Sequence, residues 1–383
     1  MADKSKEKGE RLRVGVVGCG VIAATHIPYI RKAGGDLVGI ADMSLVNAND
    51  LADRFNVQRI YRTAEELIAA ESPDVIHVLT PPHTHADVAI AALERGVHVL
   101  VEKPMALEVE DAERMVAAAV AAGRILTVDH NRLFDPVMLQ ARQLVESGAV
   151  GDIVAIESYQ AGSASDRPWL AHLPGGGLGD LVPHPLYLQL AFLGPVREIQ
   201  AVAFGTVPET GATPAELRVL MRGDDRSGVL TISTAARPQL NTLKICGTNL
   251  TLEANMNNMT LAKRREYNVP KIIGKPLPNL DEAWQLVSQT VRSTVDFVRG
   301  KVRYYPGMGN LIDGFYEAVR SGAEAPVTAE QGADVVRVTS AIWEAVARAA
   351  EAGRDEPVTV AVDDVDENVT VDTEREMLAS AEG

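Results

Sequence analysis

The stretch Val14-Gly15-Val16-Val17-Gly18-Cys19-Gly20-Val21-Ile22-Ala23 decides the fold of the first third of the chain. An apolar run typical of a strand leads into a glycine-rich turn, and a helical pattern follows. Gly18 permits a tight turn, Gly20 lets the backbone approach a pyrophosphate, and the small Ala23 lets helix and strand pack closely. This order is the context that a dinucleotide-binding fingerprint requires. It predicts cofactor contacts from Gly18, Gly20, Val21 and Ile22.

Asp42 ends the second apolar run, 19 residues after Ala23. A carboxylate at this position accepts hydrogen bonds from the hydroxyls of the adenosine ribose and repels a 2′-phosphate. No arginine follows within the next several residues. The sequence therefore predicts NAD as cofactor, with NADP disfavoured. In the alternative interpretation, Asp42 only caps the turn into the next helix.

Strand-type and helix-type segments alternate from Arg13 to about Asp129, which indicates a parallel sheet covered by helices, an α/β Rossmann domain. The expected strands are 13–17, 37–42, a short one near Ile60, 75–79, 98–102 and 125–128. The expected helices are 22–33, 45–55, 64–70, 84–95 and 108–122, the third opened by a capping box of Thr63 and Glu66.

Beyond Pro136, strands follow strands, which predicts an α+β domain with a large, mainly antiparallel open sheet. Helices expected at 310–321 and 330–350 could cover one face of that sheet. The predicted organisation is a tail over 1–11, an NAD-binding Rossmann domain over 12–130, an α+β substrate and oligomerisation domain over 131–362, and an acidic tail over 363–383.

The charge of the chain narrows its class of partners. It has 383 residues and a formal net charge of -15, which argues against nucleic acid as a binding partner.

The longest apolar run, Met115 to Ala122, is far too short to span a bilayer. Two cysteines give no disulfide framework, and residues 1–13 lack the apolar middle of a secretory signal, so we expect the cytoplasm.

The charges are distributed unevenly in the last third of the chain. Residues 263–303 hold nine basic and four acidic side chains, and residues 363–383 hold eight acidic and one basic. A solvated helix face and a tail or subunit contact explain this pattern, and a patch for an anionic substrate is the alternative.

Polar residues follow the expected fourth and fifth strands, at the edge where open parallel sheets bind ligands. Thr80, Pro81, His83 and His85 follow the first of these strands, and Glu102 and Lys103 follow the second. We expect these six residues to contact the cofactor. A lysine fixed there by a following proline can exchange a proton with a substrate hydroxyl. Taken alone, such a lysine is more often an exposed or ion-paired side chain.

A glycine-rich run, residues 175–179, leads into Asp180 and His184. Glycines let a backbone pass close to a ligand, and at the start of a helix two residues four apart project from one face. A histidine beside a carboxylate exchanges protons near neutral pH. A helix cap with a hydrogen-bonded histidine is the competing interpretation.

Four motifs carry a resemblance to a known family: the fingerprint with Asp42, Glu102-Lys103-Pro104, the Asp180-x-x-x-His184 pattern and Asn131-Arg132-Leu133-Phe134-Asp135-Pro136. Over residues 12–353 the chain resembles the glucose-fructose oxidoreductase/inositol dehydrogenase/rhizopine catabolism (Gfo/Idh/MocA) family. The resemblance implies hydride transfer between nicotinamide and a ring carbinol of a sugar, sugar derivative or nucleotide sugar. It also implies a homodimer or homotetramer formed through the open sheet.

The resemblance assigns Lys103, Asp180 and His184 to the acid-base site, with Asn131 beside both cofactor and substrate. Arg167, Trp169 and Tyr187 are further candidates for substrate contact. Val182 and Tyr187 replace a glycine and an aspartate that are usual in the family, which weakens the transfer of substrate identity. Tyr187 either stacks on a sugar ring or fills the core.

Three alternatives stay open. His83, His85, His130 and His172 could converge on zinc, although His-x-His alone is a weak metal signal and we expect none. Tightly bound NAD could support redox-assisted lyase or epimerase chemistry on a glycoside. A non-catalytic NAD sensor or scaffold is the third possibility, and Lys103, Asp180 and His184 argue against it.

Overall fold

The computed structural model describes residues 11–163, 169–170, 173–207, 214–299, 305–351 and 358–362. They fall into two compact units. One unit takes its described residues from 1–149, 258–263 and 267–336, and the other takes them from 150–257, 264–266 and 337–383. Within the described ranges, no helix is both long enough and apolar enough to cross a membrane.

The first unit contains a parallel sheet in the order β3-β2-β1-β4-β5-β6. Its strands are β1 (Arg13–Val17), β2 (Asp36–Ala41), β3 (Ile60–Tyr61), β4 (Val75–Val78), β5 (His98–Val101) and β6 (Leu126–Val128). The strand order reverses between β1 and β4, and such a point is where doubly wound sheets bind ligands. The expected Rossmann sheet is confirmed, with strand ends within about two residues of those predicted.

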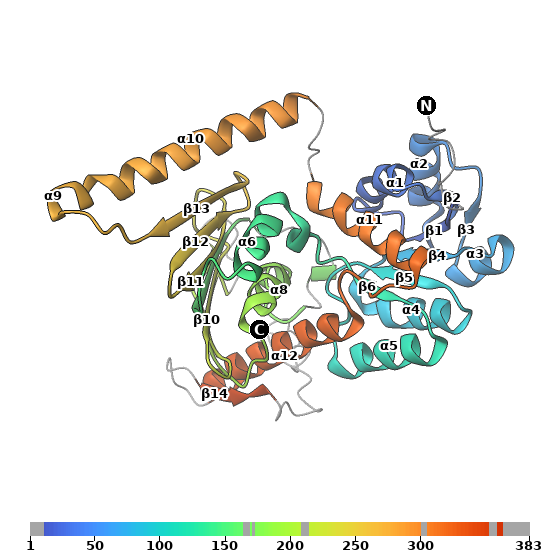
Figure 1. Cartoon of the computed structure of the whole chain (residues 1–383). Helices are drawn as coiled ribbons and strands as arrows, with labels where there is room; N and C mark the ends of the chain where they lie inside the picture. The colour runs from blue at the N-terminus through green and yellow to red at the C-terminus, as the bar shows by residue number, and fades with distance from the viewer. Residues whose placement is uncertain are drawn as a thin grey trace, which may run out of the picture. The chain divides into compact units, whose positions relative to one another are not determined.

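Helices cover both faces of this sheet (Figure 1). One face packs against α1 (Ala23–Lys32), α2 (Leu45–Phe55) and α11 (Pro306–Ser321). The other side carries α3 (Ala64–Glu71), α4 (His85–Glu94) and α5 (Val109–Ala122). The expectation that the helix near 310–321 covers the second sheet is wrong, because Ile312, Phe315 and Tyr316 of α11 are fully buried in the Rossmann core.

The capping box at α3 forms as expected. The amide of Glu66 donates to Oγ1 of Thr63 at 3.2 Å, and the Glu66 carboxylate accepts from the amide of Arg62 at 2.9 Å. The N-cap side chain therefore satisfies the amide of Glu66, and the Glu66 side chain bonds the residue before the cap.

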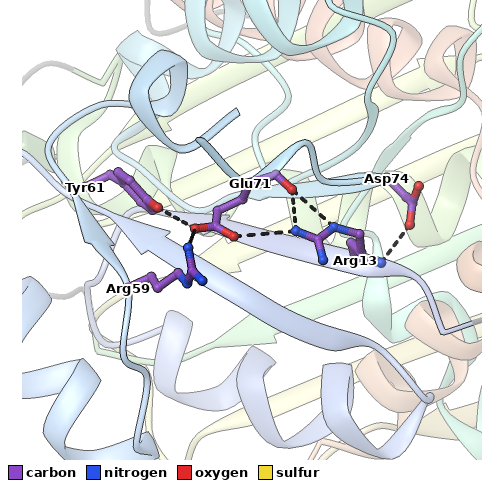
Figure 2. Close-up of polar contacts among 5 residues, drawn as sticks. All are labelled: Arg13, Arg59, Tyr61, Glu71 and Asp74. Carbon is purple, nitrogen blue, oxygen red and sulfur yellow. Dashed lines mark hydrogen bonds and ion pairs between the residues drawn. The ribbon is translucent and has the colours of Figure 1, made fainter. Parts of the chain in front are cut away.

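A polar network links β1, β3 and α3 of the first unit (Figure 2). Glu71 accepts hydrogen bonds from Tyr61 and, at 2.8 Å, from Arg59, and the Arg13 guanidinium lies 3.5 Å from its carboxylate. The Arg13 amide donates to Asp74 at 2.7 Å. Tyr61 and then Arg59 lower the pKa of Glu71 against the effect of burial. This network ties the end of α3 to the start of β1 and to β3.

A second sheet has eight strands in the order β13-β12-β11-β7-β10-β9-β8-β14. The strands are β7 (Ile153–Ala161), β8 (Glu198–Phe204), β9 (Glu216–Arg222), β10 (Ser227–Ser233), β11 (Leu240–Gly247), β12 (Leu250–Asn255), β13 (Thr260–Arg265) and β14 (Val358–Ala361). Strands β7 and β10 pair in parallel, whereas β10–β9, β11–β12, β11–β7, β14–β8 and β8–β9 pair in antiparallel orientation, so the expected mainly antiparallel sheet is confirmed.

The remaining helices are α6 (Pro136–Glu146), α7 (Gly176–Gly179), α8 (Pro183–Leu193), α9 (Lys271–Gly274), α10 (Pro276–Val298) and α12 (Ala329–Glu351), with short 3-10 turns η1 (Pro82–Thr84) and η2 (Asn131–Phe134). The apolar helix α8 lies on one face of the second sheet, where Gln189 donates to the carbonyl of Val229 at 2.7 Å. This contact satisfies the amide nitrogen of Gln189 and ties the helix to the strand.

Candidate functional site

The glycine turn after β1 is shaped by the backbone beside it. Gly18 has φ +96°, and a Cβ there would lie 2.5 Å from the backbone carbon of Leu79. A Cβ at Gly20 would meet nothing within 4 Å, and Val21 is 78% exposed. No side chain caps the start of α1 at Ile22. An open backbone at a helix N-terminus is suited to the pyrophosphate of a dinucleotide.

Asp42 follows β2 and is bonded to the same turn. Its Oδ2 accepts from the amide of Cys19 at 2.7 Å, and its Oδ1 accepts from the amide of Ser44 at 2.7 Å. The bond to Ser44 is the capping contact of the alternative interpretation. Each carboxylate oxygen can accept more than one hydrogen bond, so this contact does not exclude ribose binding. Burial and then Asp42 raise the pKa of the Cys19 thiol to about 12, which makes it unreactive.

His85 joins the two candidate loops at the carboxyl edge. Its Nδ1 lies 2.8 Å from the carbonyl oxygen of Pro104, and its Nε2 lies 2.8 Å from that of Thr80. The ring is fully buried, and burial lowers its pKa, whereas the two carbonyl acceptors favour the protonated form. These two contacts indicate that His85 holds the Thr80 loop and the Pro104 loop together. His83 is exposed, Pro81 is exposed and Thr80 is half-buried.

Glu102 and Lys103 follow β5, with a cis peptide bond between Lys103 and Pro104. The Lys103 amide donates to Oε2 of Glu102 at 2.9 Å, so the glutamate side chain folds back on its own turn. The other oxygen of Glu102 lies 3.5 Å from Nε2 of His26. Burial and then Asp129 raise the pKa of Glu102, opposed by His26 and Lys103. The turn that carries Lys103 is therefore anchored to the buried His26 through the carboxylate of Glu102.

His26 is buried between two carboxylates. Its Nε2 also lies 3.2 Å from Oδ2 of Asp129, which follows β6, and both side chains are fully buried. Burial lowers the pKa of His26, but Asp129 and then Glu102 outweigh it and raise it to about 9. His26 is thus an imidazolium at neutral pH. No pattern in the sequence singles out His26.

The protonated ring sets the tautomers of its neighbours. Nδ1 of His26 lies 3.2 Å from Nδ1 of His77, and Nε2 of His77 lies 3.0 Å from the hydroxyl of Tyr316. A cationic His26 donates from Nδ1, so the neutral His77 accepts there and carries its proton on Nε2. Burial and then the charge of His26 hold the pKa of His77 well below its usual value.

A metal is the competing interpretation of this cluster. Ligand atoms of His26, Glu102 and Asp129 lie within 4.8 Å of one another. An imidazolium between two carboxylates accounts for the same geometry.

Of the histidines considered for zinc, His85 and His130 are buried, His83 is exposed, and His172 lies outside the described residues. Burial, opposed by Glu102, lowers the pKa of His130 to about 3, so it is neutral.

Asp180 and His184 stand at the start of α8. Asp180 lies between α7 and α8 rather than inside a helix, and its φ of -64° and ψ of -23° are close to helical. Nδ1 of His184 lies 3.0 Å from the hydroxyl of Tyr187, whose ring is edge-on to the imidazole. Tyr187 is only 2% exposed, so it fills the core and orients His184 rather than presenting a face to a sugar.

The glycine-rich run has a packing explanation. Gly175 has φ +71°, and a Cβ there would lie 2.0 Å from the Trp343 ring. The glycine is thus required by α12, and close approach to a ligand is not needed to explain it. Trp169 and Asn131 are half-buried, and Arg167 lies outside the described residues.

Two family models match successive parts of the chain. Residues 12–130 match the family model described as "Oxidoreductase family, NAD-binding Rossmann fold". Residues 138–253 match the model described as "GFO/IDH/MocA C-terminal domain". The chain belongs to the GFO/IDH/MocA oxidoreductase family. It is therefore an NAD-binding oxidoreductase, as the sequence predicts.

Individual GFO/IDH/MocA relatives are distant. An uncharacterized oxidoreductase, ORF334 of Rhizobium meliloti, is 27% identical over 91% of this chain and 99% of its own. D-glucoside 3-dehydrogenase of Escherichia coli K12 is 30% identical over 52% of this chain and 60% of its own. A levoglucosan dehydrogenase solved with NADH and levoglucosan superposes with a TM-score of 0.75 at 21% identity, covering 92% and 99% of the two chains. This likeness establishes the fold.

Proposed function

We propose that the protein is an NAD-dependent dehydrogenase that oxidises a ring carbinol of a sugar or sugar derivative. The observation that carries the proposal is the pair of bonds from His85 to Thr80 and Pro104. These bonds join the Lys103 turn to the loop that packs on Gly18, so the lysine belongs to the edge that would hold the dinucleotide. The relatives that act on D-glucoside and levoglucosan support a sugar as substrate.

The cofactor would be held by the backbone after Gly18, by the amides at the start of α1 and by Asp42. The open space at Gly20 fits the approach of a pyrophosphate. The negative charge of Asp42 favours NAD over NADP. Bound NAD supplies a hydride acceptor.

The proton chemistry is assigned to Lys103, Asp180 and His184. When Nδ1–H of His184 donates to the Tyr187 hydroxyl, Nε2 carries the lone pair and can remove a proton from the substrate hydroxyl. Lys103 would donate a hydrogen bond to the developing alkoxide, and Asp180 would orient the substrate and Lys103. Groups of this kind contribute about 10²–10⁴-fold each.

We assign substrate contact also to Asn131, Trp169 and Arg167. The basic side chains between 263 and 303 support an anionic handle only weakly, because Arg264 is paired with Glu253 at 3.1 Å. Both cysteines are free thiols, which agrees with a location in the cytoplasm.

We propose that the second sheet forms a subunit interface. On the face away from α8, Leu220 and Val229 are directly opposite each other in register and both are exposed. Exposed apolar pairs on an open sheet are suited to burial against a second copy. A sheet-mediated dimer agrees with these observations.

The test of the activity is a panel of sugars, glucosides and nucleotide sugars with NAD, followed at 340 nm. The wild type should reduce NAD with at least one member. Lys103→Ala and His184→Asn should each lose at least about 100-fold in kcat and retain NADH affinity. Full activity of the double variant would overturn the assignment.

A further inference from the structure

His26 connects the helix that follows the glycine turn with the turn that carries Lys103. The ring lies near the start of α1 and is fully buried. Its Nε2 is 3.5 Å from Oε1 of Glu102, and Oε2 of Glu102 accepts from the Lys103 amide at 2.9 Å. A single glutamate side chain therefore links the buried imidazolium to the backbone of the candidate catalytic lysine.

The link depends on a carboxylate at position 102. One oxygen of Glu102 faces a cation and the other accepts from a backbone amide, so both oxygens serve as acceptors. A glutamine side chain has one acceptor oxygen and one donor nitrogen, and it can satisfy only one of these two partners. An ionised glutamate is thus the side chain that suits both contacts.

A second carboxylate makes the charge of His26 necessary. Oδ2 of Asp129 lies 3.2 Å from the same nitrogen, and ligand atoms of His26, Glu102 and Asp129 lie within 4.8 Å of one another. Both oxygens of Asp129 are buried, and neither accepts a hydrogen bond from a residue in the part of the chain that the structure describes. Two buried carboxylates this close repel each other strongly unless a cation lies beside them. Without His26, the repulsion would displace Glu102 from the Lys103 amide.

The backbone is held on both sides of the half-buried Lys103. Glu102 bonds its amide, and Nδ1 of His85 lies 2.8 Å from the carbonyl oxygen of the following Pro104. A displacement of about 1 Å at a reacting group costs about 10²-fold in rate. A contact that fixes the Lys103 backbone can therefore act on the reaction without touching the substrate.

We propose that His26 is a positioning residue for Lys103: its imidazolium holds the Glu102 carboxylate in place, and the carboxylate holds the Lys103 amide. The inference rests on the proposed function, which gives Lys103 the hydrogen bond to the substrate alkoxide. His26 is fully buried, so it acts through Glu102 and not on the substrate.

The kinetic test removes the cation and then the repulsion. His26→Gln should lower kcat for the sugar found by the panel at least about tenfold, with KM and the Kd of NADH within about twofold of the wild type. Adding Asp129→Asn to the same chain leaves Glu102 as the one carboxylate of the cluster and should restore part of kcat. The loss in the double variant should be smaller than the product of the losses in the two single variants.

A matched control lies at the far end of the same buried chain of side chains. Tyr316→Phe removes the hydroxyl 3.0 Å from Nε2 of His77 and leaves the pair of His26 and Glu102 intact. This variant should keep the wild-type kcat even if its melting temperature falls. An equal loss of kcat in Tyr316→Phe and His26→Gln would show that the whole chain serves only stability.

Hydrogen exchange gives a reading that needs no substrate. The Lys103 amide should exchange faster in His26→Gln than in the wild type and in Tyr316→Phe, measured by mass spectrometry with fragmentation to single amides. The Leu79 amide, which donates to the carbonyl of Val17 at 2.7 Å, is the reference for opening of the whole sheet. If His26→Gln does not fold, Glu102→Gln breaks the same link from its other end and should show the same two effects.

The outcomes separate this inference from the proposed function. Loss of activity in Lys103→Ala together with full kcat in His26→Gln would overturn the positioning role and leave the proposed function standing. Full activity in Lys103→Ala would overturn both. If the panel gives no sugar, the proposed function fails, and the exchange of the Lys103 amide still decides whether His26 holds this turn: an unchanged rate in His26→Gln would overturn the link.

Discussion

Nε2 of His26 lies 3.2 Å from Oδ2 of Asp129, and neither side chain is exposed to solvent. The ion pair joins the helix that follows the glycine turn to the end of β6. Glu102 joins it from the end of β5, at 3.5 Å from the same nitrogen. Removing one partner of a buried pair leaves an uncompensated charge. The shape of the carboxyl edge therefore depends on the protonation of one histidine.

This histidine should make the stability of the fold depend on alkaline pH. Asp129 and Glu102, against burial, raise its pKa from 6.5 to about 9. A group whose folded pKa is raised contributes stability that is complete below pH 6.5 and is lost as pH rises through 9. The contribution is on the order of 3 kcal/mol. Urea unfolding between pH 6 and 9.5 should show the decline, and His26→Asn should lack it. A wild-type midpoint that stays constant over this range would contradict the ion pair.

Two glycines of one turn should respond differently to an added methyl group. Gly18→Ala forces a left-handed residue against the Leu79 backbone, at a cost on the order of 1–3 kcal/mol or more. Gly20→Ala enters open space and should change the stability by less than about 0.5 kcal/mol. It should nevertheless weaken NADH binding if the pyrophosphate lies there. Thermal unfolding and NADH fluorescence separate the two effects. Unchanged NADH affinity in Gly20→Ala would place the cofactor elsewhere.

Asp42 should determine the choice between the two nicotinamide cofactors. Replacing it by Ser removes a negative charge from the position expected for the ribose 2′-oxygen, so the ratio of Kd values for NADH and NADPH should move toward NADPH by about tenfold or more. The melting temperature must be compared as well, because Asp42 also accepts from the amides of Cys19 and Ser44. If the ratio stays constant, capping is the whole role of Asp42.

Tyr187 should act through His184. Tyr187→Phe removes the hydroxyl 3.0 Å from Nδ1 of His184 and leaves the buried ring. We expect kcat to fall by about tenfold and its pH profile to shift, with NADH affinity unchanged. Tyr29→Phe, which removes another tyrosine hydroxyl that accepts from the amide of Tyr305, is the control for general packing. Equal kcat and pH profiles in both variants would show that Tyr187 is only a core residue.

The sequence predicts the Rossmann domain well because its signals are local. Capping at Thr63, the glycine turn and the alternation of short apolar runs each fix an element within a few residues. For residues 263–303 the sequence predicts only a solvated helix face, without bounds, and α10 (Pro276–Val298) lies within that segment. Strands β13 and β14 have weak local signals, because the first ends in basic residues and the second is only four residues long.

The candidate site was predictable only in part. Lys103 follows the carboxyl end of β5, as expected. Tyr187, a candidate for stacking on a sugar, is instead buried and bonded to His184. The pairing of His26 with Asp129 was not predictable from spacing, because three elements far apart in the chain meet only once the strand order is known. A charged residue directly after a buried strand, as at Asp129, is the signal that could have suggested it.

The most direct test of the central claim follows the hydrogen itself. Once the panel has identified a sugar, its ring carbons are deuterated one at a time, each labelled sugar is incubated with NAD, and the reduced cofactor is examined by mass spectrometry and NMR. We predict that one labelled position, and no other, transfers its deuterium to nicotinamide C4, and that this transfer is lost in Lys103→Ala and in His184→Asn. Reduced cofactor that carries no deuterium from any ring carbon would contradict carbinol oxidation by this protein.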